Sequence, residues 1–214
     1  MQILEVNKLT NFKHLNLFST KYKDKIGNIK SWIFASRLDS PNVIKKASNS
    51  SKIDYQNEDN SKDLRINSTD INKPNAVVIV PFHLDYQKLV IIKEFRVPLG
   101  NYQYGFPAGL MDRGEDIEQT AARELKEETG LEIVSIIKKS PTIYSSSGMT
   151  DESISLVYAT CKGEPSIKWN EESEDITVIM VSPKEGEILL ANSEIKFDVK
   201  SWIVLSIFAQ TGKI

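Results

Sequence analysis

The sequence lacks paired cysteines and clustered histidines. With a single cysteine, Cys161, it cannot form an intrachain disulfide, which fits a reducing compartment. The two histidines, His14 and His83, are far apart in the sequence and outside any metal-ligand spacing, so we interpret both as structural or surface residues.

Long hydrophobic runs and a charge excess are also absent. No apolar run approaches the roughly 18 residues that a membrane-spanning helix needs, and the opening MQILEVNKLTNFKH lacks the charged-then-apolar layout of a signal peptide. With 27 basic and 29 acidic residues the net charge is −2, which does not favour nucleic-acid binding. We therefore expect a cytoplasmic protein that binds neither membranes nor nucleic acid.

The composition changes twice along the 214 residues. Residues 12–37 hold two β-like runs, HLNLFSTKY and IKSWIFASR, around a turn, which predicts a hairpin. Residues 45–75 are rich in Asn, Ser, Asp and Lys and would bury little, so we expect an irregular insertion. We predict a small N-terminal β unit over 1–75 and a second domain over 76–214.

The second domain alternates strand and helix patterns. Buried strands are predicted at AVVIVPF, KLVIIKEF, LEIVSIIKKS, SISLVYATC and ITVIMVS. One helix is predicted after Ser182-Pro183, an N-cap and first-turn pair. A second is predicted over 198–212, with apolar residues at helical spacing expected in the core: Val199, Trp202, Ile203 and Phe208. The order predicts an α/β fold, a mixed sheet with helices on both faces.

A further helix follows a glycine-containing loop. Gly109 and Gly114 flank the loop, Asp116 is a plausible N-cap, and Glu118 lies in the first turn, where the helix dipole favours negative charge. Gly130 is the expected end of the helix.

Three glutamates share one face of that helix. Glu124, Glu127 and Glu128 follow i, i+3, i+4 spacing, and like charges so placed repel by about 0.2–0.5 kcal/mol per pair. Arg123, four residues before Glu127, can form an ion pair with one of them. A solvated acidic face is one interpretation. The other is a site for a hard cation such as Mg²⁺, which binds carboxylate oxygens and bridges to phosphates.

The stretch from Gly109 to Leu131 decides between them. It fits the pattern G-x5-E-x7-R-E-U-x-E-E-x-G-U, where U is aliphatic, and fills every fixed position: Gly109, Glu115, Arg123, Glu124, Leu125, Glu127, Glu128, Gly130 and Leu131. The pattern resembles the signature of the Nudix hydrolases, which cleave a nucleoside diphosphate linked to another moiety. This resemblance implies an α/β/α sandwich with a mixed sheet, preceded in the sequence by a small N-terminal β unit.

The resemblance also implies a metal site. Mg²⁺, with Mn²⁺ able to replace it, would be held by Glu124, Glu128, Glu127 and the backbone carbonyl of Ala108. Glu115 would support the loop or the surroundings of the metal. Arg123 would hold the glutamates in place.

The flanking segment KEFRVPLGNYQYGFPAGLMDRGE is most similar to the ADP-ribose pyrophosphatases. That similarity implies a diphosphate contact by Arg96, adenine stacking by Trp32, and further substrate contacts by Arg37 and Met149. It also implies a homodimer through the N-terminal unit. Two positions depart from the subgroup: Ser147, where proline is usual, and Gly105, where an acidic residue is common.

A general base is expected in the acidic loop KWNEESEDITVIMV, where the subgroup places a glutamate. Glu172 and Glu174 both match, and we favour Glu174, with Glu172 as an alternate base or a metal ligand. The expected reaction converts ADP-ribose to AMP and ribose 5-phosphate. The alternatives are a broader nucleoside diphosphate sugar hydrolase, acting for example on GDP-mannose, and a non-catalytic Nudix regulator that binds a nucleotide metabolite.

Overall fold

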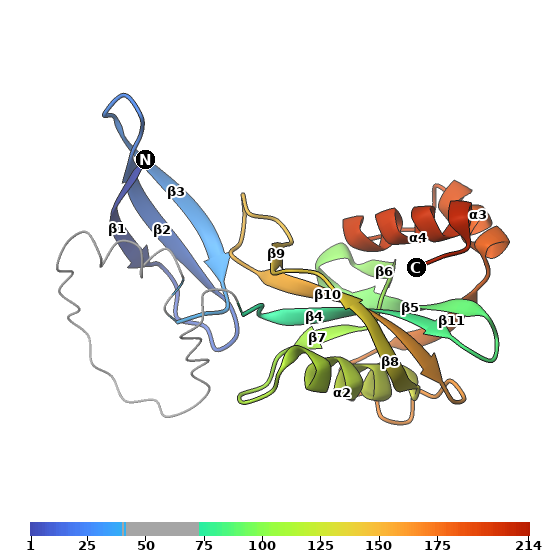
Figure 1. Cartoon of the computed structure of the whole chain (residues 1–214). Helices are drawn as coiled ribbons and strands as arrows, with labels where there is room; N and C mark the ends of the chain where they lie inside the picture. Colours follow the sequence, from blue (N-terminus) through green and yellow to red (C-terminus); the bar gives the residue numbers. More distant parts are fainter. Residues whose placement is uncertain (40, 42–72) are drawn as a thin grey trace. The chain divides into compact units, whose positions relative to one another are not determined.

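The computed structural model describes residues 1–39, 41 and 73–214 (Figure 1). The polar insertion predicted over 45–75 therefore lies, up to residue 72, outside the described residues. The chain divides into two compact units. Unit 1 holds residues 1–74 and 142–153, and unit 2 holds residues 75–141 and 154–214.

Unit 1 contains a three-stranded antiparallel sheet in the order β1-β2-β3. Its strands are β1 (Gln2–Lys8), β2 (Asn16–Lys23) and β3 (Ile29–Ser36). The predicted hairpin is present as β2 and β3, whereas β1 was not predicted. Phe18 is buried and stacks on Phe34 with ring centroids 5.6 Å apart. The segment 142–153 carries the short strand β9 (Ile143–Tyr144).

Unit 2 is built on a mixed sheet whose main order is β11-β5-β4-β10-β8. These strands are β4 (Ala76–His83), β5 (Lys88–Arg96), β8 (Glu132–Lys139), β10 (Ser153–Lys162) and β11 (Ile176–Val181). After a 3-10 turn (Val97–Leu99), β6 (Asn101–Gly105) pairs with β5, and β7 (Ala108–Leu110) pairs with β4. β10 runs parallel to β4, and its pairing with β8 is antiparallel.

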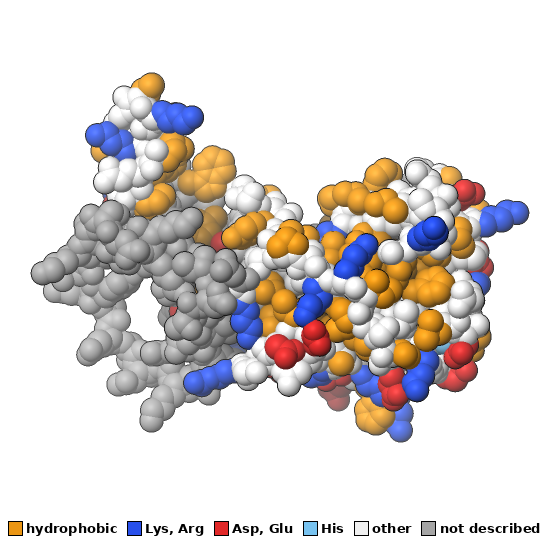
Figure 2. All heavy atoms as spheres, viewed as in Figure 1, with side chains coloured by type: hydrophobic (Ala, Val, Ile, Leu, Met, Phe, Trp, Pro, Cys, Tyr) orange, Lys and Arg blue, Asp and Glu red, His pale blue; other side chains and the backbone are white. Residues whose placement is uncertain are grey.

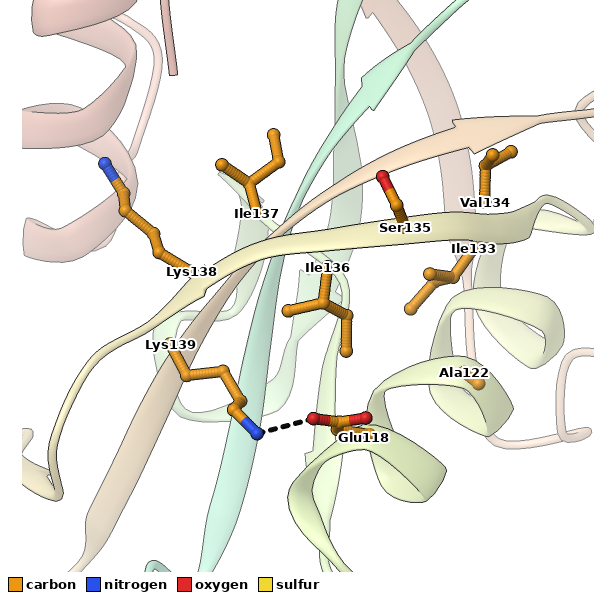
Figure 3. A pocket seen from close by; sticks show the side chains of 9 residues that line it. All are labelled: Glu118, Ala122, Ile133, Val134, Ser135, Ile136, Ile137, Lys138 and Lys139. Atoms are coloured by element: carbon orange, nitrogen blue, oxygen red, sulfur yellow. Dashed lines mark hydrogen bonds and ion pairs between the residues drawn. The ribbon is translucent and has the colours of Figure 1, made fainter.

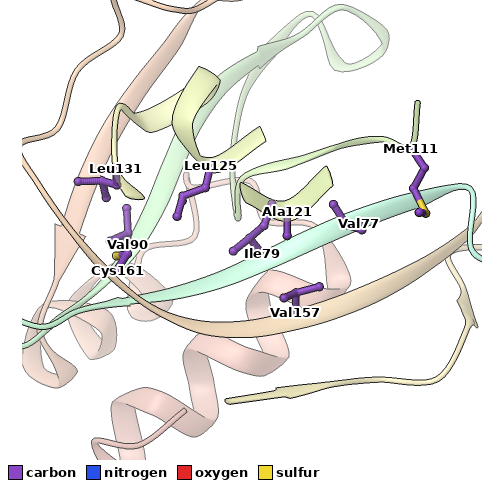
Figure 4. Packing of buried hydrophobic residues seen from close by; sticks show 9 residues of the cluster. All are labelled: Val77, Ile79, Val90, Met111, Ala121, Leu125, Leu131, Val157 and Cys161. Atoms are coloured by element: carbon purple, nitrogen blue, oxygen red, sulfur yellow. The ribbon is translucent and has the colours of Figure 1, made fainter. Parts of the chain in front are cut away.

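Helices cover both faces of this sheet, as predicted (Figure 1). Helix α2 (Ile117–Thr129) lies on one face, and α3 (Pro183–Ala191) and α4 (Val199–Thr211) lie on the other. Between α2 and the sheet, a cluster of buried side chains forms the core (Figure 4): Val77, Ile79, Val90, Met111, Ala121, Leu125, Leu131, Val157 and Cys161. Full burial of such an aliphatic side chain is worth about 1.5–3 kcal/mol, so this cluster fixes α2 against the sheet.

The predicted core face of α4 is wrong. Phe208 is buried, but Val199, Trp202 and Ile203 are 75%, 51% and 47% exposed. The buried face comprises Ser201, Val204, Leu205, Phe208 and Ala209. Because apolar residues occur all round this helix, their spacing could not define its rotation. In the space-filling view, hydrophobic side chains gather over α3 and α4 (Figure 2).

The two histidines are structural or exposed, as predicted. His83 is buried, its Nε2 lies 2.8 Å from the Gly163 carbonyl oxygen, and its Nδ1 is 3.3 Å from the Tyr86 backbone N–H. Because Nδ1 faces a donor, Nε2 carries the proton and donates to Gly163. Burial raises the pKa of the Cys161 thiol to about 12, so it stays protonated at neutral pH.

Across the described residues, every helix is too short or too polar to traverse a lipid bilayer.

Candidate active site

Helix α2 begins and ends at the residues the sequence indicated. The Asp116 carboxylate accepts hydrogen bonds from the backbone N–H groups of Glu118 and Gln119, both at 2.9 Å, and the Gln119 side chain accepts one from the Asp116 N–H at 3.0 Å. Gly130 ends the helix at φ 74°, where its N–H donates to the Lys126 carbonyl. Such caps contribute about 1 kcal/mol each, so the register of the carboxylate face is well defined.

Arg123 donates hydrogen bonds to three carboxylates. Its Nε and Nη2 donate to the two oxygens of Glu115 at 2.9 and 3.0 Å. Its Nη1 donates to Glu124 at 2.7 Å and to Glu127 at 3.0 Å, and Nη2 also reaches the Leu110 carbonyl at 3.1 Å. The hydrogen bonds from Arg123 lower the pKa of Glu115 to about 2. One guanidinium therefore contacts both the loop and the helix; the spacing alone indicated its contact with Glu127, and the resemblance implied that it holds the glutamates in place.

Two of the glutamates are buried. Glu124 is 9% exposed and Glu128 is 5% exposed. Burial raises the pKa of Glu124 although Arg123 opposes this, and burial raises the pKa of Glu128 well above its usual value. The backbone N–H of Ala108 donates to Glu128 Oε2 at 3.0 Å. The protein thus holds two acidic groups in a setting that disfavours their charge unless a cation is near.

The loop before the helix fits closely around these groups. Gly109, beside Ala108 on β7, faces the Glu124 carboxylate so closely that a side chain at this position would overlap it. The φ angle of Gly109 is not positive, so the lack of space, and not the backbone conformation, requires glycine here. The motif glycine is explained by a tertiary contact.

The donor set suits a hard divalent cation. Glu124, Glu127, Glu128 and the Ala108 carbonyl all offer oxygen atoms, the ligands that Mg²⁺ and Mn²⁺ prefer. Within the parts of the chain described, no three His, Cys, Asp or Glu side chains already converge as a metal-binding group. Arg123 engages Glu124 and Glu127 in this structure. The residues fit the cation by their chemistry, because each offers an oxygen ligand.

The acidic loop brings a further carboxylate to the helix. Glu174 closes a turn with Glu171: its N–H donates to the Glu171 carbonyl at 3.0 Å, and its carboxylate accepts the Glu171 N–H at 2.9 Å. The charge of Glu174 contributes, after burial, to the raised pKa values of both Glu124 and Glu128. Glu174 therefore lies within electrostatic range of both. Glu172 is exposed on the same loop.

Arg96 is linked to this cluster through a residue that the sequence did not mark. Its Nη1 forms a short ion pair with Glu94 at 2.5 Å, and its side chain is 51% exposed. The Glu94 charge is among the causes, after burial, of the raised pKa of Glu128. No motif in the sequence marked Glu94, because its contact with Arg96 forms only where β5 ends.

The two departures from the subgroup have different settings. A β-carbon at Gly105 would lie 3.3 Å from Asp198 Oδ2. Asp198 caps α4, accepting the Ser201 N–H at 3.1 Å and the Ser201 hydroxyl at 2.6 Å. An acidic side chain at position 105 would therefore bring a second negative charge to this cap. Ser147 lies exposed in the loop of unit 1.

Unit 1 brings three predicted substrate contacts together. Trp32 is 51% exposed, and its indole N–H donates to the Gly148 carbonyl at 3.0 Å. Met149, 72% exposed, accepts a backbone hydrogen bond from β3 at 2.8 Å. Arg37 Nε lies 3.5 Å from Glu152 Oε1. The loop 142–153 thus folds onto β3, and the side chains of Trp32 and Met149 are both exposed.

A surface hollow of about 630 Å³ lies elsewhere, between α2 and β8 (Figure 3). It is lined by Glu118, Ala122 and residues 133–139. Its helix residues lie on a different face of α2 from the glutamates. Glu118, its one carboxylate, is paired with Lys139 at 2.6 Å. This hollow therefore does not include the glutamates of the carboxylate face.

Comparisons with known proteins agree on one family. The model of the NUDIX domain matches residues 72–203. An ADP-ribose pyrophosphatase of Bacillus subtilis is 30% identical over 131 residues, covering 61% of this chain and 70% of that protein. That of Saccharomyces cerevisiae is 46% identical over 70 residues, covering 33% and 30%. A nudix hydrolase of Caenorhabditis elegans is 36% identical over 102 residues, covering 48% and 44%. This chain thus spans less than half the length of the yeast and worm relatives.

A solved structure supports the fold. The crystal structure of an ADP compounds hydrolase matches with a TM-score of 0.66 and 20% sequence identity, covering all of this chain and 96% of that one. At this identity the likeness is evidence for the fold alone.

Proposed function

Because this chain belongs to the Nudix family, we propose that it hydrolyses the pyrophosphate bond of a nucleoside diphosphate linked to another moiety. ADP-ribose is the leading substrate, yielding AMP and ribose 5-phosphate, and its support is the similarity to ADP-ribose pyrophosphatases. The observation that carries the proposal is the pair of buried glutamates, Glu124 and Glu128, with Glu174 brought into range from a distant loop.

The helix and its loop supply the metal-binding part. A divalent cation, Mg²⁺ or Mn²⁺, held by Glu124, Glu127, Glu128 and the Ala108 carbonyl, would neutralise charge on the diphosphate. Arg123 keeps these carboxylates oriented through its hydrogen bonds to Glu124 and Glu127. Burial disfavours the negative charge of Glu124 and Glu128, and a bound divalent cation would compensate that charge.

Two other side chains act on the substrate and the water. Glu174 accepts a proton from the attacking water, whose oxygen forms the new bond to phosphorus as the bridging P–O bond breaks. Arg96 offers its planar donors to the diphosphate oxygens after leaving Glu94. Both roles depend on positioning, which dominates phosphoryl-transfer catalysis.

The choice of base is tested by Glu174→Gln and Glu172→Gln. Loss of a general base costs about 10²–10⁴-fold in rate, so kcat of the Glu174 variant should fall by at least about 100-fold, whereas the Glu172 variant should lose much less. A large loss only in the Glu172 variant would reverse the assignment. Unchanged rates in both would remove the loop from the mechanism.

The N-terminal unit is proposed to serve the nucleoside end of the substrate and dimerisation. Trp32, an exposed ring held by its hydrogen bond to the Gly148 carbonyl, suits stacking on adenine, which is worth about 1–3 kcal/mol per base. Arg37 would add a polar contact. Trp32→Ala should then raise KM more than it lowers kcat. Exposed apolar side chains on β2 and β3, Leu17, Ile29 and Ile33, suit a homodimer, which light scattering would test. The buried thiol of Cys161 suits the cytoplasm.

One experiment separates the candidate functions. The protein is incubated with Mg²⁺ and ADP-ribose, other ADP-sugars, GDP-mannose, NADH or diadenosine polyphosphates, and the released monophosphate is followed. Preference for ADP-ribose is expected. The departures at Ser147 and Gly105 favour a broader nucleoside diphosphate sugar hydrolase as the second candidate, and comparable rates on GDP-mannose would indicate it. Binding without turnover of any compound would indicate a nucleotide-binding regulator.

A further inference from the structure

We propose that Asn170 and Tyr102 are positioning residues that anchor the acidic loop 171–175 at its two ends. The first attaches the loop to helix α2, and the second attaches it to strand β6. The inference rests on the proposed function, since it concerns how Glu174 is presented to the carboxylate face.

Asn170 forms the first anchor. Its side-chain amide faces two backbone carbonyls, so its nitrogen is the atom that points at them. It donates to the Ile167 carbonyl at 3.2 Å and to the Glu127 carbonyl at 3.0 Å. Because Glu127 belongs to the carboxylate face itself, this amide ties the residue before the acidic loop directly to the helix that carries the site.

The segment before Asn170 packs closely on the same end of the helix. The Ser166 N–H donates to the Thr129 carbonyl at 2.8 Å. A β-carbon at Gly130 would lie 2.8 Å from the Ser166 β-carbon, so Gly130 is required by the approaching loop as well as by its φ of 74°. The last carbonyls of α2 are thus satisfied by the chain that leads into the acidic loop.

Tyr102 forms the second anchor, at the other end. Its hydroxyl donates to Asp175 Oδ2 at 2.5 Å, and the Phe95 N–H donates to the Asp175 carbonyl at 3.1 Å. The ring is held edge-to-face against Phe95 with centroids 5.4 Å apart, and Lys93 Nζ lies 4.4 Å from the ring centroid. The hydrogen bond that the Tyr102 hydroxyl donates to Asp175 raises the pKa of Tyr102, so the hydroxyl remains a donor at neutral pH.

Between the two anchors lies the turn closed by Glu171 and Glu174. A carboxylate on a short loop fixed at both ends samples fewer positions than one on an open loop. The entropy of placing the base is then lost on folding and not during each turnover, which raises kcat without requiring tighter substrate binding. The anchors act through Glu174, and neither is proposed to touch the substrate.

The test uses variants that remove each anchor with little change in volume. Asn170→Asp replaces the donor nitrogen with an oxygen facing two carbonyls, and Tyr102→Phe removes only the hydroxyl while keeping the ring. Asn170→Ala also removes the donor nitrogen, but it places no oxygen opposite the two carbonyls and is therefore milder than Asn170→Asp. The matched control is Lys168→Ala in the segment before Asn170, where the side chain is exposed and its ammonium lies over the Trp169 ring.

The expected result is a loss in kcat of about threefold to tenfold for Tyr102→Phe and Asn170→Ala, as for one lost hydrogen bond. Asn170→Asp should lose more. KM for ADP-ribose should change little, and Lys168→Ala should match wild type. Hydrogen exchange of backbone amides in residues 166–175 should accelerate in the anchor variants while exchange in the core strands β4 and β5 stays unchanged.

Two results would overturn the inference. One is wild-type kcat in all three anchor variants, Asn170→Asp, Asn170→Ala and Tyr102→Phe. The other is a loss that follows a lower melting temperature with no faster exchange in the loop, since that indicates a merely structural role. If wild-type protein turns over none of the compounds, the proposed function has failed. The exchange measurement, which needs no activity, then still decides whether Asn170 and Tyr102 anchor the loop.

Discussion

The carboxylate of Glu124 fills the space where a side chain on Gly109 would lie. A β-carbon built on Gly109 would lie 1.9 Å from the carboxyl carbon of Glu124 and 1.9 Å from its Oε1, far inside any van der Waals contact. The first residue of the motif is therefore a glycine because a buried carboxylate fifteen positions later fills the space where a side chain would be.

Gly109→Ala should consequently displace Glu124, the proposed metal ligand, and lower kcat/KM by about 10- to 100-fold, the usual cost of a change beside such a ligand. The fold should persist, because the glycine φ is ordinary. Steady-state rates and circular dichroism check both parts. Gly186→Ala in α3 is the control, since its β-carbon would meet a flexible leucine side chain at 3.2 Å. Activity within twofold of wild type in Gly109→Ala would contradict the assignment.

Glu128→Gln should separate activity from stability. The amide can still accept the Ala108 N–H, and it removes a buried negative charge, so the free energy of unfolding without metal should stay equal or rise by about 1 kcal/mol. Turnover should be lost, as should the increase in melting temperature that we expect Mg²⁺ to give the wild type. Calorimetry with and without Mg²⁺ measures this. An unchanged Mg²⁺ effect would exclude Glu128 as a ligand.

Arg123→Lys should destabilise the protein although the charge is kept. Lysine cannot reproduce the two parallel hydrogen bonds to Glu115 while also reaching Glu124 and Glu127. The expected loss in free energy of unfolding is about 1.5–3 kcal/mol, the range for hydrogen bonds to charged groups. Urea unfolding measures it, with the exposed Arg113→Lys as control. Equal losses in the two variants would refute the special role of Arg123.

Stability at low pH should depend in part on Glu185. Hydrogen bonds from Ser182, at the start of α3, and from Lys88 lower the pKa of Glu185 to about 2 from a usual value of 4.5. A lowered folded-state pKa adds stability above pH 4.5 that is lost as the pH falls from about 4.5 to about 2. Melting temperatures between pH 6 and pH 2 should therefore decline less steeply in Glu185→Gln. Parallel curves would disprove the contribution.

Not all of the fold was predictable. Strand β1 was missed because its alternation is interrupted: the pairing with β2 shifts between Ile3 and Glu5, so the period of two is not visible in the letters. The orientation of α4 was mispredicted because both of its faces are apolar. By contrast, the ends of α2 were predicted at Asp116 and Gly130, since capping depends on local hydrogen bonds that the residue types determine.

The sequence by itself determined the family, the layered α/β fold, the carboxylate helix and its limits, because these depend on local spacing and on interactions within a few residues. Only the tertiary structure decided which glutamates are buried and that the Glu124 carboxylate fills the space beside Gly109. It also decided that Arg123 pairs with Glu115, Glu124 and Glu127. Glu174 comes near the helix only through the fold. Burial and charge interactions between distant segments depend on how strands and loops pack. No spacing along one segment encodes that packing.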